Sequence, residues 1–435
     1  MAARQVKIYV SNRSPRLNYI AGIILGDILG LSWDIVTDKR RIGKDPVINY
    51  SDTYIAGSFK ITPAGILFEK GIDKKHLNIS VWRKLPIFYQ TDGESDLPFD
   101  IFAASFYMVT RYEEYSDHQT DEHGRFRAAS SMAFSGRFLD KPVVDLWTRE
   151  FARALLGKYP GLVFRKNNFS SIITIDSDQP FAYLGKNFLT GLGGFIRDAA
   201  VRRKKAFERY KVLFRGKQDP YYVFDYIMEA ISKYGTPARF FFPAADYSEY
   251  DKNPSWKSQE YRNLIGKAGS RYGVGIHPSY FAAENPALLG KEIRRLVSIT
   301  GESVTSSRYH YLRISFPSSF RELVNLGIVE DFSLGYHDEP GFRAGIARPF
   351  FFYDVTEDVH TNLKIIPFQV MDGTLFQYKK LDPVSSWEII GHLINETKQV
   401  GGLFVSIWHN TSLLDTPEWK EWREVFDRIL KTCMQ

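Results

Sequence analysis

The chain has 435 residues, of which 44% are apolar and 15% aromatic. This length favours two globular domains, and no apolar run approaches the roughly 20 residues that span a bilayer. Cys433 is the single cysteine, which excludes an internal disulfide and a cysteine-based metal cluster. Because the first residues also lack a signal-peptide core, we expect a cytoplasmic protein.

The net charge of +7 comes from one segment. Residues 181–220 contain ten Lys or Arg and three Asp or Glu, whereas the rest of the chain is neutral overall. Aromatic and aliphatic residues are mixed with these cations. The mixture is typical of a helix that lies on an anionic membrane surface or binds an acidic glycan, and it equally fits a solvated pair of helices. We expect no nucleic-acid binding, because no such motif is present.

In the first part of the chain, residues 5–10 have the alternation of a strand, and residues 16–30 resemble a helix. Further along, apolar residues recur at helical spacing from Ile101 to Tyr112, with Pro98 where a helix could begin. We interpret residues 1–165 as an α/β domain whose role the sequence does not reveal.

From about residue 166 to 435, short apolar runs alternate with amphipathic helices. We predict strands in the ranges 170–176, 238–244, 272–278, 309–315, 326–335, 363–371 and 401–410. We predict helices between them at 221–234, 291–301, 318–327 and 385–398. This alternation indicates parallel strands with crossover helices, and about seven strands suggest a (β/α) barrel. The basic segment 181–220 is then an insertion after the first strand.

Chemically versatile side chains lie at the ends of several predicted strands. They are Asp176, Asp178, His277, Arg308 and His409. The carboxyl ends of barrel strands meet on one face, so we expect these side chains to lie close together. Two carboxylates, two histidines and an arginine are enough for one divalent cation, one base and one acid.

Each motif also fits a structural role when taken alone. The Asp-x-Asp pair could close a turn or cap a helix. His277 could be a packed histidine bonded to backbone, and Arg308 could be an ion-pair partner of Asp176. The order of the motifs along the chain makes the functional interpretation the stronger one.

The motif order resembles the polysaccharide deacetylases, carbohydrate esterase family 4. The segment "TIDSD" is similar to the first motif of that family, which implies that Asp176 is the base and Asp178 a metal ligand. "GIHPSYF" is similar to the start of the second motif and implies that His277 is a metal ligand. "SRYHY" supplies Arg308, which would orient the base, and the final strand ends in His409, which would be the general acid.

The resemblance is incomplete at one position. The second motif normally ends in another metal-binding histidine, but this chain has Phe281 there. His310, two residues after Arg308, is the candidate for the missing ligand. The family implies a divalent metal, with zinc as the first choice.

Two functions follow from this resemblance. The first is a metal-dependent hydrolase that removes an acyl group, most commonly acetyl, from an amino sugar of a surface glycan or its precursor. The alternative is a catalytically inactive barrel that binds glycan and has lost its metal. Both expect a carbohydrate partner, and metal content separates them.

Overall fold

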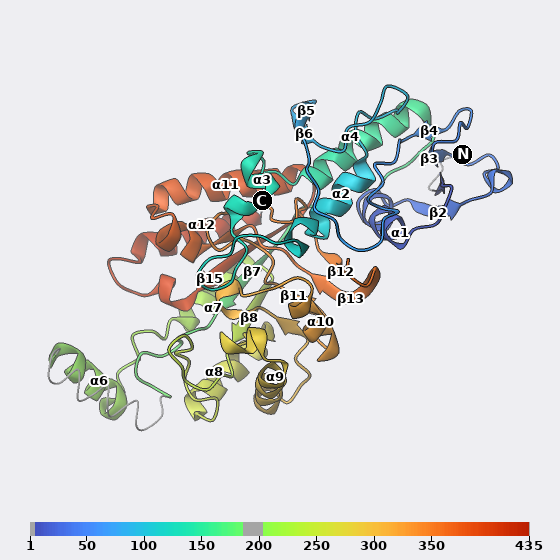
Figure 1. Ribbon diagram of the computed structural model, residues 1–435. Coiled ribbons are helices and arrows are strands. Elements are labelled where there is room, and N and C mark those ends of the chain that lie inside the picture. The colour runs from blue at the N-terminus through green and yellow to red at the C-terminus, as the bar shows by residue number, and fades with distance from the viewer. Residues whose placement is uncertain (1–4, 186–202, 435) are drawn as a thin grey trace.

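The structure is a computed structural model that describes residues 5–185 and 203–434. Two main sheets organise these residues, one in the N-terminal and one in the C-terminal part of the chain, and residues 80–87 form a third sheet of two strands (Figure 1). The predicted α/β class is confirmed.

The N-terminal sheet has four parallel strands in the order β2-β1-β3-β4. Their bounds are β1 (Gln5–Tyr9), β2 (Ser32–Val36), β3 (Val47–Asn49) and β4 (Phe59–Lys60). The other elements are α1 (Pro15–Ala21), the π-helix η1 (Gly22–Ile28), η2 (Lys39–Arg41), β5 (Ser80–Trp82), β6 (Leu85–Ile87), α2 (Ile101–Val109), η3 (Tyr112–Tyr115), η4 (Ala128–Ser130), α3 (Met132–Ser135) and α4 (Val143–Lys158). The predicted helix near Ile101 is present as α2. Its N-cap is Asp100, whose carboxylate accepts a hydrogen bond from the backbone of Ala103.

The C-terminal sheet has nine strands in the order β12-β13-β11-β10-β9-β8-β7-β15-β14. Their bounds are β7 (Ser170–Asp176), β8 (Ala238–Phe242), β9 (Gly273–Ile276), β10 (Ser306–Ser307), β11 (Glu330–Asp331), β12 (Phe350–Asp354), β13 (Val359–Ile365), β14 (Val370–Met371) and β15 (Leu403–His409). All neighbouring pairs are parallel except β12 with β13.

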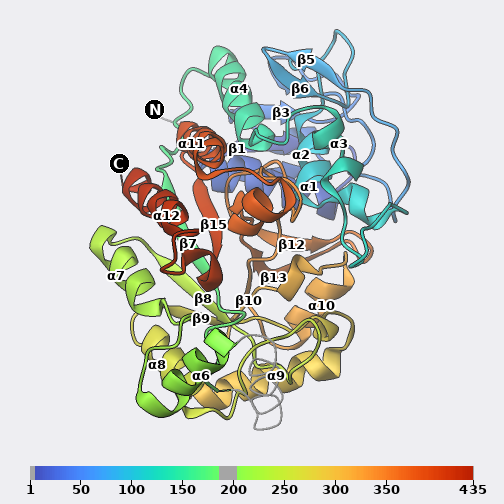
Figure 2. The ribbon, with the colours of Figure 1, turned by 90° about the vertical axis from the view of Figure 1, so that its left-hand side faces the viewer.

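Helices surround this sheet (Figure 2). They are α7 (Phe224–Tyr234), α8 (Gln259–Gly269), α9 (Pro286–Thr300), α10 (Ser318–Asn325), α11 (Pro383–Gln399) and α12 (Lys420–Cys433). The four predicted helices correspond to α7, α9, α10 and α11. No prediction covers the helices α8 and α12 or the strands β10 and β12.

One predicted strand is wrong. The range 309–315 is not a strand: β10 ends at Ser307, and His310–Leu312 form a short 3-10 turn. Tyr311 and Leu312 in this turn have φ angles of 58° and 56°, in the left-handed region that non-glycine residues rarely adopt. The backbone therefore leaves the sheet at the motif that carries Arg308 and His310. The predicted strand 363–371 divides into the end of β13 and the short β14.

The two parts of the chain share one continuous hydrophobic core. Buried ion pairs also join them. Glu114 in η3 accepts hydrogen bonds from Arg111 and from Arg343 of the C-terminal part, and all three side chains are almost fully buried. Asp145 in α4 accepts from the Ala347 backbone and the Arg348 guanidinium.

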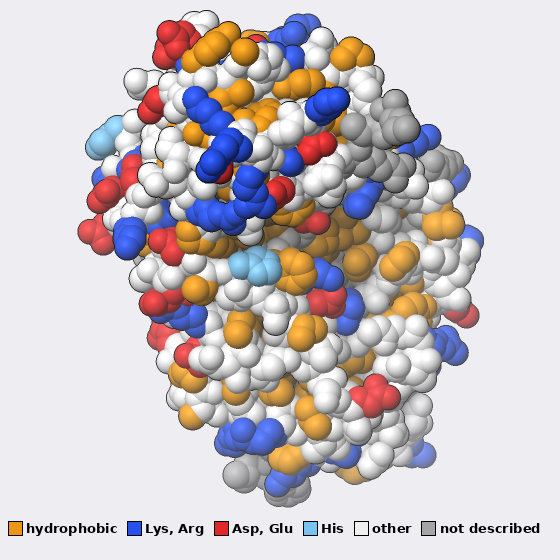
Figure 3. Space-filling model, turned by 90° about the vertical axis from the view of Figure 1, so that its right-hand side faces the viewer, with side chains coloured by type: hydrophobic (Ala, Val, Ile, Leu, Met, Phe, Trp, Pro, Cys, Tyr) orange, Lys and Arg blue, Asp and Glu red, His pale blue; other side chains and the backbone are white. Residues whose placement is uncertain are grey.

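The outer side of this junction is a cleft of about 380 Å³ with mainly aromatic walls. Tyr19 and Trp33 line it from the N-terminal part, and Phe351 and His360 line it from β12 and β13. Figure 3 views the molecule from the side of the N-terminal sheet and shows Lys and Arg side chains gathered on that face.

The buried Glu114 gives a stability prediction. Glu114→Ala would leave the Arg111 and Arg343 guanidinium groups buried without their shared carboxylate, which should lower the free energy of unfolding by about 3–5 kcal/mol. Glu94→Ala, which breaks an exposed pair with Lys60, should cost about 0–1 kcal/mol. Urea denaturation measures both values. Equal effects of the two substitutions would contradict a structural role for Glu114 at the junction.

Candidate active site

The carboxyl ends of the central parallel strands bring the predicted residues together. Asp176 is the last residue of β7 and pairs with Phe241 in β8 and His409 in β15. His277 follows β9 and Arg308 follows β10. Residues separated by more than two hundred positions in sequence are therefore neighbours at one edge of the sheet.

Three of these side chains converge in the way a metal site requires. The Asp178 carboxylate lies 3.1 Å from Nε2 of His277 through one oxygen and 3.4 Å from Nε2 of His310 through the other. One ligand atom from each residue lies within 4.8 Å of those of the other two. His310 thus points toward Asp178 and His277, as expected of the residue predicted to replace the missing ligand. Phe281 lies apart, 48% exposed and packed against the rings of Tyr250 and Tyr280.

The atoms of His277 fit a cation at this point. Its Nδ1 lies 2.5 Å from the Arg308 carbonyl oxygen, which can only accept, so Nδ1 carries the hydrogen. In the neutral ring Nε2 then holds a lone pair that faces the Asp178 carboxylate. The His277 Nε2 atom and the Asp178 Oδ1 atom are both buried without a hydrogen-bond partner. Two buried acceptors 3.1 Å apart are unfavourable unless a proton or metal ion lies between them.

The motif glycine explains why His277 comes so close to Arg308. A Cβ on Gly275 would lie 2.8 Å from the Ser306 carbonyl oxygen and 2.6 Å from the Phe241 ring. Only glycine lets β9 and β10 approach each other here.

His310 is oriented by Asp251, a buried carboxylate that the sequence analysis missed. The His310 Nδ1 donates to Asp251 over 2.9 Å, so Nε2 is directed at Asp178. A carboxylate behind a histidine is the usual way to fix the orientation of a metal-binding ring. Burial lowers the pKa of His310, but Asp178 and Asp251 more than offset it and raise that pKa to about 9. The Nε2 atom of His310 is therefore a strongly basic atom directed at Asp178.

His409 has a matching partner in Asp372, which was also missed. The His409 Nδ1 and backbone N–H each donate to Asp372 over 2.7 Å. Its Nε2 faces the site, 3.7 Å from Asp178. Burial lowers the pKa of His409, but Asp372 outweighs burial and raises the pKa to about 10. A protonated imidazole at neutral pH is suited to donate a proton.

The carboxylate of Asp178 stays charged in this setting. Burial alone would raise its pKa, but His310, His277 and His409 lower the pKa well below its usual range. An ionised Asp178 among three imidazole rings is the state that a metal ligand needs.

Asp176 and Arg308 form a second buried pair beneath these rings. Nη1 of Arg308 lies 3.6 Å from Asp176, and both side chains are buried. The guanidinium packs against the rings of Phe241, Phe332 and Phe368. Burial lowers the pKa of Arg308, and Asp176 partly counters this. Arg308 therefore lies where its guanidinium can orient the Asp176 carboxylate.

These groups face a cavity of about 240 Å³. The cavity is lined by five of the predicted site residues, Asp176, Asp178, His277, His310 and His409. Other lining residues are Arg125, Gln179, Tyr250, Lys252, Tyr311, Phe376 and Tyr378. Aromatic walls with a few convergent polar groups are typical of a small-ligand site.

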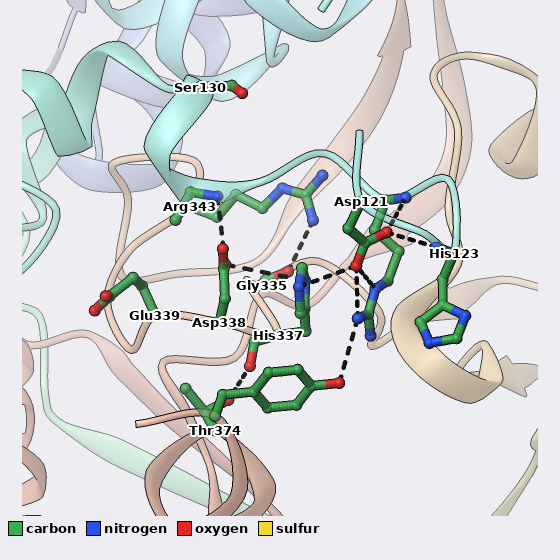
Figure 4. Close-up of polar contacts among 12 residues, drawn as sticks. Asp121, His123, Ser130, Gly335, His337, Asp338, Glu339, Arg343 and Thr374 are labelled. Carbon is green, nitrogen blue, oxygen red and sulfur yellow. Dashed lines mark hydrogen bonds and ion pairs between the residues drawn. The ribbon is translucent and has the colours of Figure 1, made fainter. Parts of the chain in front are cut away.

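Arg125 reaches this cavity from the N-terminal part of the chain. Its guanidinium donates to Asp121, to the Tyr311 carbonyl and to the Tyr378 hydroxyl. Asp121 is in turn 3.2 Å from Nε2 of His337 (Figure 4). Because Tyr311 follows His310 in the left-handed turn, the N-terminal part supports the loop that presents His310.

The missed residues differ in how well the sequence could have indicated them. Asp372 directly follows the predicted strand 363–371, so the same strand-end rule would have found it. Asp251 lies in the loop after β8, and Arg125 lies outside the predicted barrel, so neither is marked by a motif.

Comparison with known proteins gives results for both parts of the chain. Residues 6–160 match the model of a family of unknown function, DUF7033. No curated protein matches the sequence.

Several solved structures are similar to this one. A protein from Mycobacterium smegmatis described as a polysaccharide deacetylase is 14% identical, with 61% of this chain and 85% of that chain covered and a TM-score of 0.40. The Puue allantoinase is 11% identical, with 61% and 84% covered and a TM-score of 0.40. A pseudoenzyme of carbohydrate esterase family 4 from Bacillus anthracis is 10% identical, with 62% of each chain covered and a TM-score of 0.31. Structural similarity to polysaccharide deacetylases and to an allantoinase is thus found over the C-terminal 60% or so of the chain.

Proposed function

We propose that this protein is a metal-dependent hydrolase that removes an acyl group, most commonly acetyl, from an amino sugar. The observation that carries the proposal is the convergence of Asp178, His277 and His310 at the cavity wall, within 4.8 Å of one another. One carboxylate and two imidazoles are a ligand set used by catalytic zinc sites, which leave a further position open.

Each residue would then have one task. Asp178, His277 and His310 would hold the metal, which polarises a carbonyl and lowers the pKa of water when bound. Asp176, oriented by Arg308, would accept the proton of the attacking water. His409, kept protonated by Asp372, would donate a proton to the leaving nitrogen or oxygen.

The polar and aromatic cavity supports a sugar as the substrate class. Tyr250, Tyr311 and Tyr378 offer flat faces and hydroxyl groups, and Gln179 offers an amide. Such groups can hydrogen-bond several hydroxyls of a pyranose ring while packing on its apolar face. The resemblance of the four motifs to polysaccharide deacetylases supports the same class.

A second function follows from Phe281. If His310 does not replace the missing histidine as a ligand, the protein would be a glycan-binding barrel without metal. Calorimetric binding of an N-acetylated amino-sugar oligosaccharide to metal-free protein, without hydrolysis, would favour this alternative.

The ligand assignment predicts metal content. His310→Ala should lower metal affinity by more than the roughly 10- to 100-fold that loss of an outer-shell partner costs, and Asp251→Asn should show that smaller loss. Elemental analysis and metal titration measure both. His392→Ala, at a half-exposed histidine that does not line the cavity, is the control. A His310→Ala protein that retains one full equivalent of metal would show that another residue completes the site.

The base assignment predicts a different pattern. Asp176→Asn should retain the metal but slow hydrolysis of an N-acetylated amino-sugar oligosaccharide by roughly 100- to 10,000-fold, because the amide cannot accept a proton. Turnover and metal content are measured on the same preparation. Wild-type turnover in this variant would remove Asp176 from the role of base.

The acid assignment predicts a pH effect. His409 has a raised pKa, so its proton is present below that value and lost as the pH rises through it. Asp372→Asn removes the main group that raises the pKa, so the alkaline limb of the kcat profile should move to lower pH. If the alkaline limb of this variant coincides with that of the wild type, His409 is not the acid.

A further inference from the structure

The helix α6 (Arg203–Arg215) stands away from the rest of the molecule (Figure 1). It belongs to the basic segment 181–220 that carries the excess positive charge of the sequence. Residues 186–202 of that segment lie outside the described residues.

One face of α6 exposes large apolar side chains. Phe207, Tyr210 and Phe214 are 59%, 39% and 70% exposed, and their spacing of three and four residues places them on one stripe. Leu213 beside them is 40% exposed. The rings of Tyr210 and Phe214 lie 5.5 Å apart. A contiguous apolar stripe on a protruding helix indicates a contact surface.

The other face of α6 is already packed. Ala206, Arg209 and Val212 recur every three residues and are buried. The Arg209 guanidinium lies over the Tyr183 ring, and Lys217 pairs with Glu208. The exposed stripe is therefore not the side on which α6 rests against its own chain.

Cations flank the stripe. Lys205, Lys211 and Arg215 are exposed and make no ion pair with any residue in the described ranges 5–185 and 203–434. The Lys211 ammonium lies 4.4 Å from the centre of the Phe207 ring. Glu208, the single acidic side chain of α6, is engaged by Lys217. The free charge around the apolar stripe is thus positive.

The base of this segment is fixed beside the candidate active site. The Asp219 carboxylate accepts from the backbone N–H groups of Ala182, Tyr183, Leu184 and Tyr221, so the chain leaves and returns at one point. Asn410, the neighbour of His409, donates to the carbonyls of Gln179 and Tyr221. The segment that carries α6 is therefore anchored near the rim of the cavity, which Gln179 lines.

We propose that α6 binds the surface of an anionic lipid bilayer, with its apolar stripe in the headgroup region and its cations on the lipid phosphates. Apolar burial and attraction to anionic lipid together are what hold an interfacial helix. No described helix is long and apolar enough to cross a membrane, so the contact is peripheral. A second copy of the chain is disfavoured, because a symmetric contact would place the same cations against each other. An acidic polysaccharide would engage the cations but would not require exposed Phe207 and Phe214.

Vesicle sedimentation of the full chain tests this proposal, and it does not depend on hydrolase activity. Wild-type protein should sediment with phosphatidylglycerol vesicles and not with phosphatidylcholine vesicles. Replacing Lys205, Lys211 and Arg215 by Gln should weaken binding roughly 100-fold, since each cation near an anionic surface contributes about five-fold. Phe207→Ser combined with Phe214→Ser should also weaken it, because the apolar stripe is lost.

The matched control replaces Lys44, Lys70 and Lys74 by Gln, three exposed lysines of the N-terminal part. It changes the net charge equally and should leave vesicle binding intact. Circular dichroism verifies that each variant is folded. The proposal is overturned if wild-type protein ignores anionic vesicles at low salt, or if the control loses as much binding as the α6 variant. It is also overturned if the serine variant binds like wild type, which would leave a polyanion as the ligand.

Discussion

The Asp178 carboxylate lies between the Nε2 atoms of three histidines at 3.1, 3.4 and 3.7 Å, with its side chain 24% exposed and one of its oxygens fully buried. Charge in such surroundings is costly unless each group has an opposite charge or a hydrogen bond. Here the three histidine rings are hydrogen-bonded on the Nδ1 side, away from Asp178. The Arg308 carbonyl, Asp251 and Asp372 each bind the Nδ1 of one ring, so all three Nε2 atoms face inward.

The three groups bound to Nδ1 differ in charge, so the three imidazole rings differ in how strongly their cationic form is favoured. His277 rests on a neutral carbonyl, whereas His310 and His409 rest on carboxylates. A carboxylate favours the cationic form of its ring. His310 and His409 therefore differ less in electrostatics than in position. His310 lies with Asp178 and His277 as a candidate ligand, and His409 ends the strand beside Asp176 as a candidate acid.

The N-terminal part is a structural component of this site rather than an appended module. Arg125 lines the cavity and binds the carbonyl of Tyr311, next to His310. The junction between the N-terminal and C-terminal parts is held by the hydrogen bonds of Glu114 with Arg111 and Arg343. Arg125 extends from the N-terminal part across this junction to the cavity. Conformational strain at a positive-φ residue such as Tyr311 persists where surrounding contacts determine it. The N-terminal part supplies one of those contacts.

Strand ends were the informative signal in the sequence. Apolar runs bounded by polar residues predict parallel strands well. The residues Asp176 and His409 at the ends of two such strands, and His277 directly after a third, could therefore be found from the sequence. His310 was found only through the motif, and its segment was mistaken for a strand because "YHYLRIS" alternates. The left-handed turn at Tyr311 depends on tertiary contacts with Arg125 that no local pattern records. Asp251 was missed for the same reason, since its loop is positioned by packing and not by periodicity.

We propose that one divalent cation binds where these side chains converge. Anomalous X-ray diffraction from crystals of the full chain grown with zinc tests it most directly. We expect a single strong peak about 2.0–2.2 Å from an Asp178 oxygen and from Nε2 of His277 and His310. A peak ligated by other residues, or none in this cavity, would contradict it.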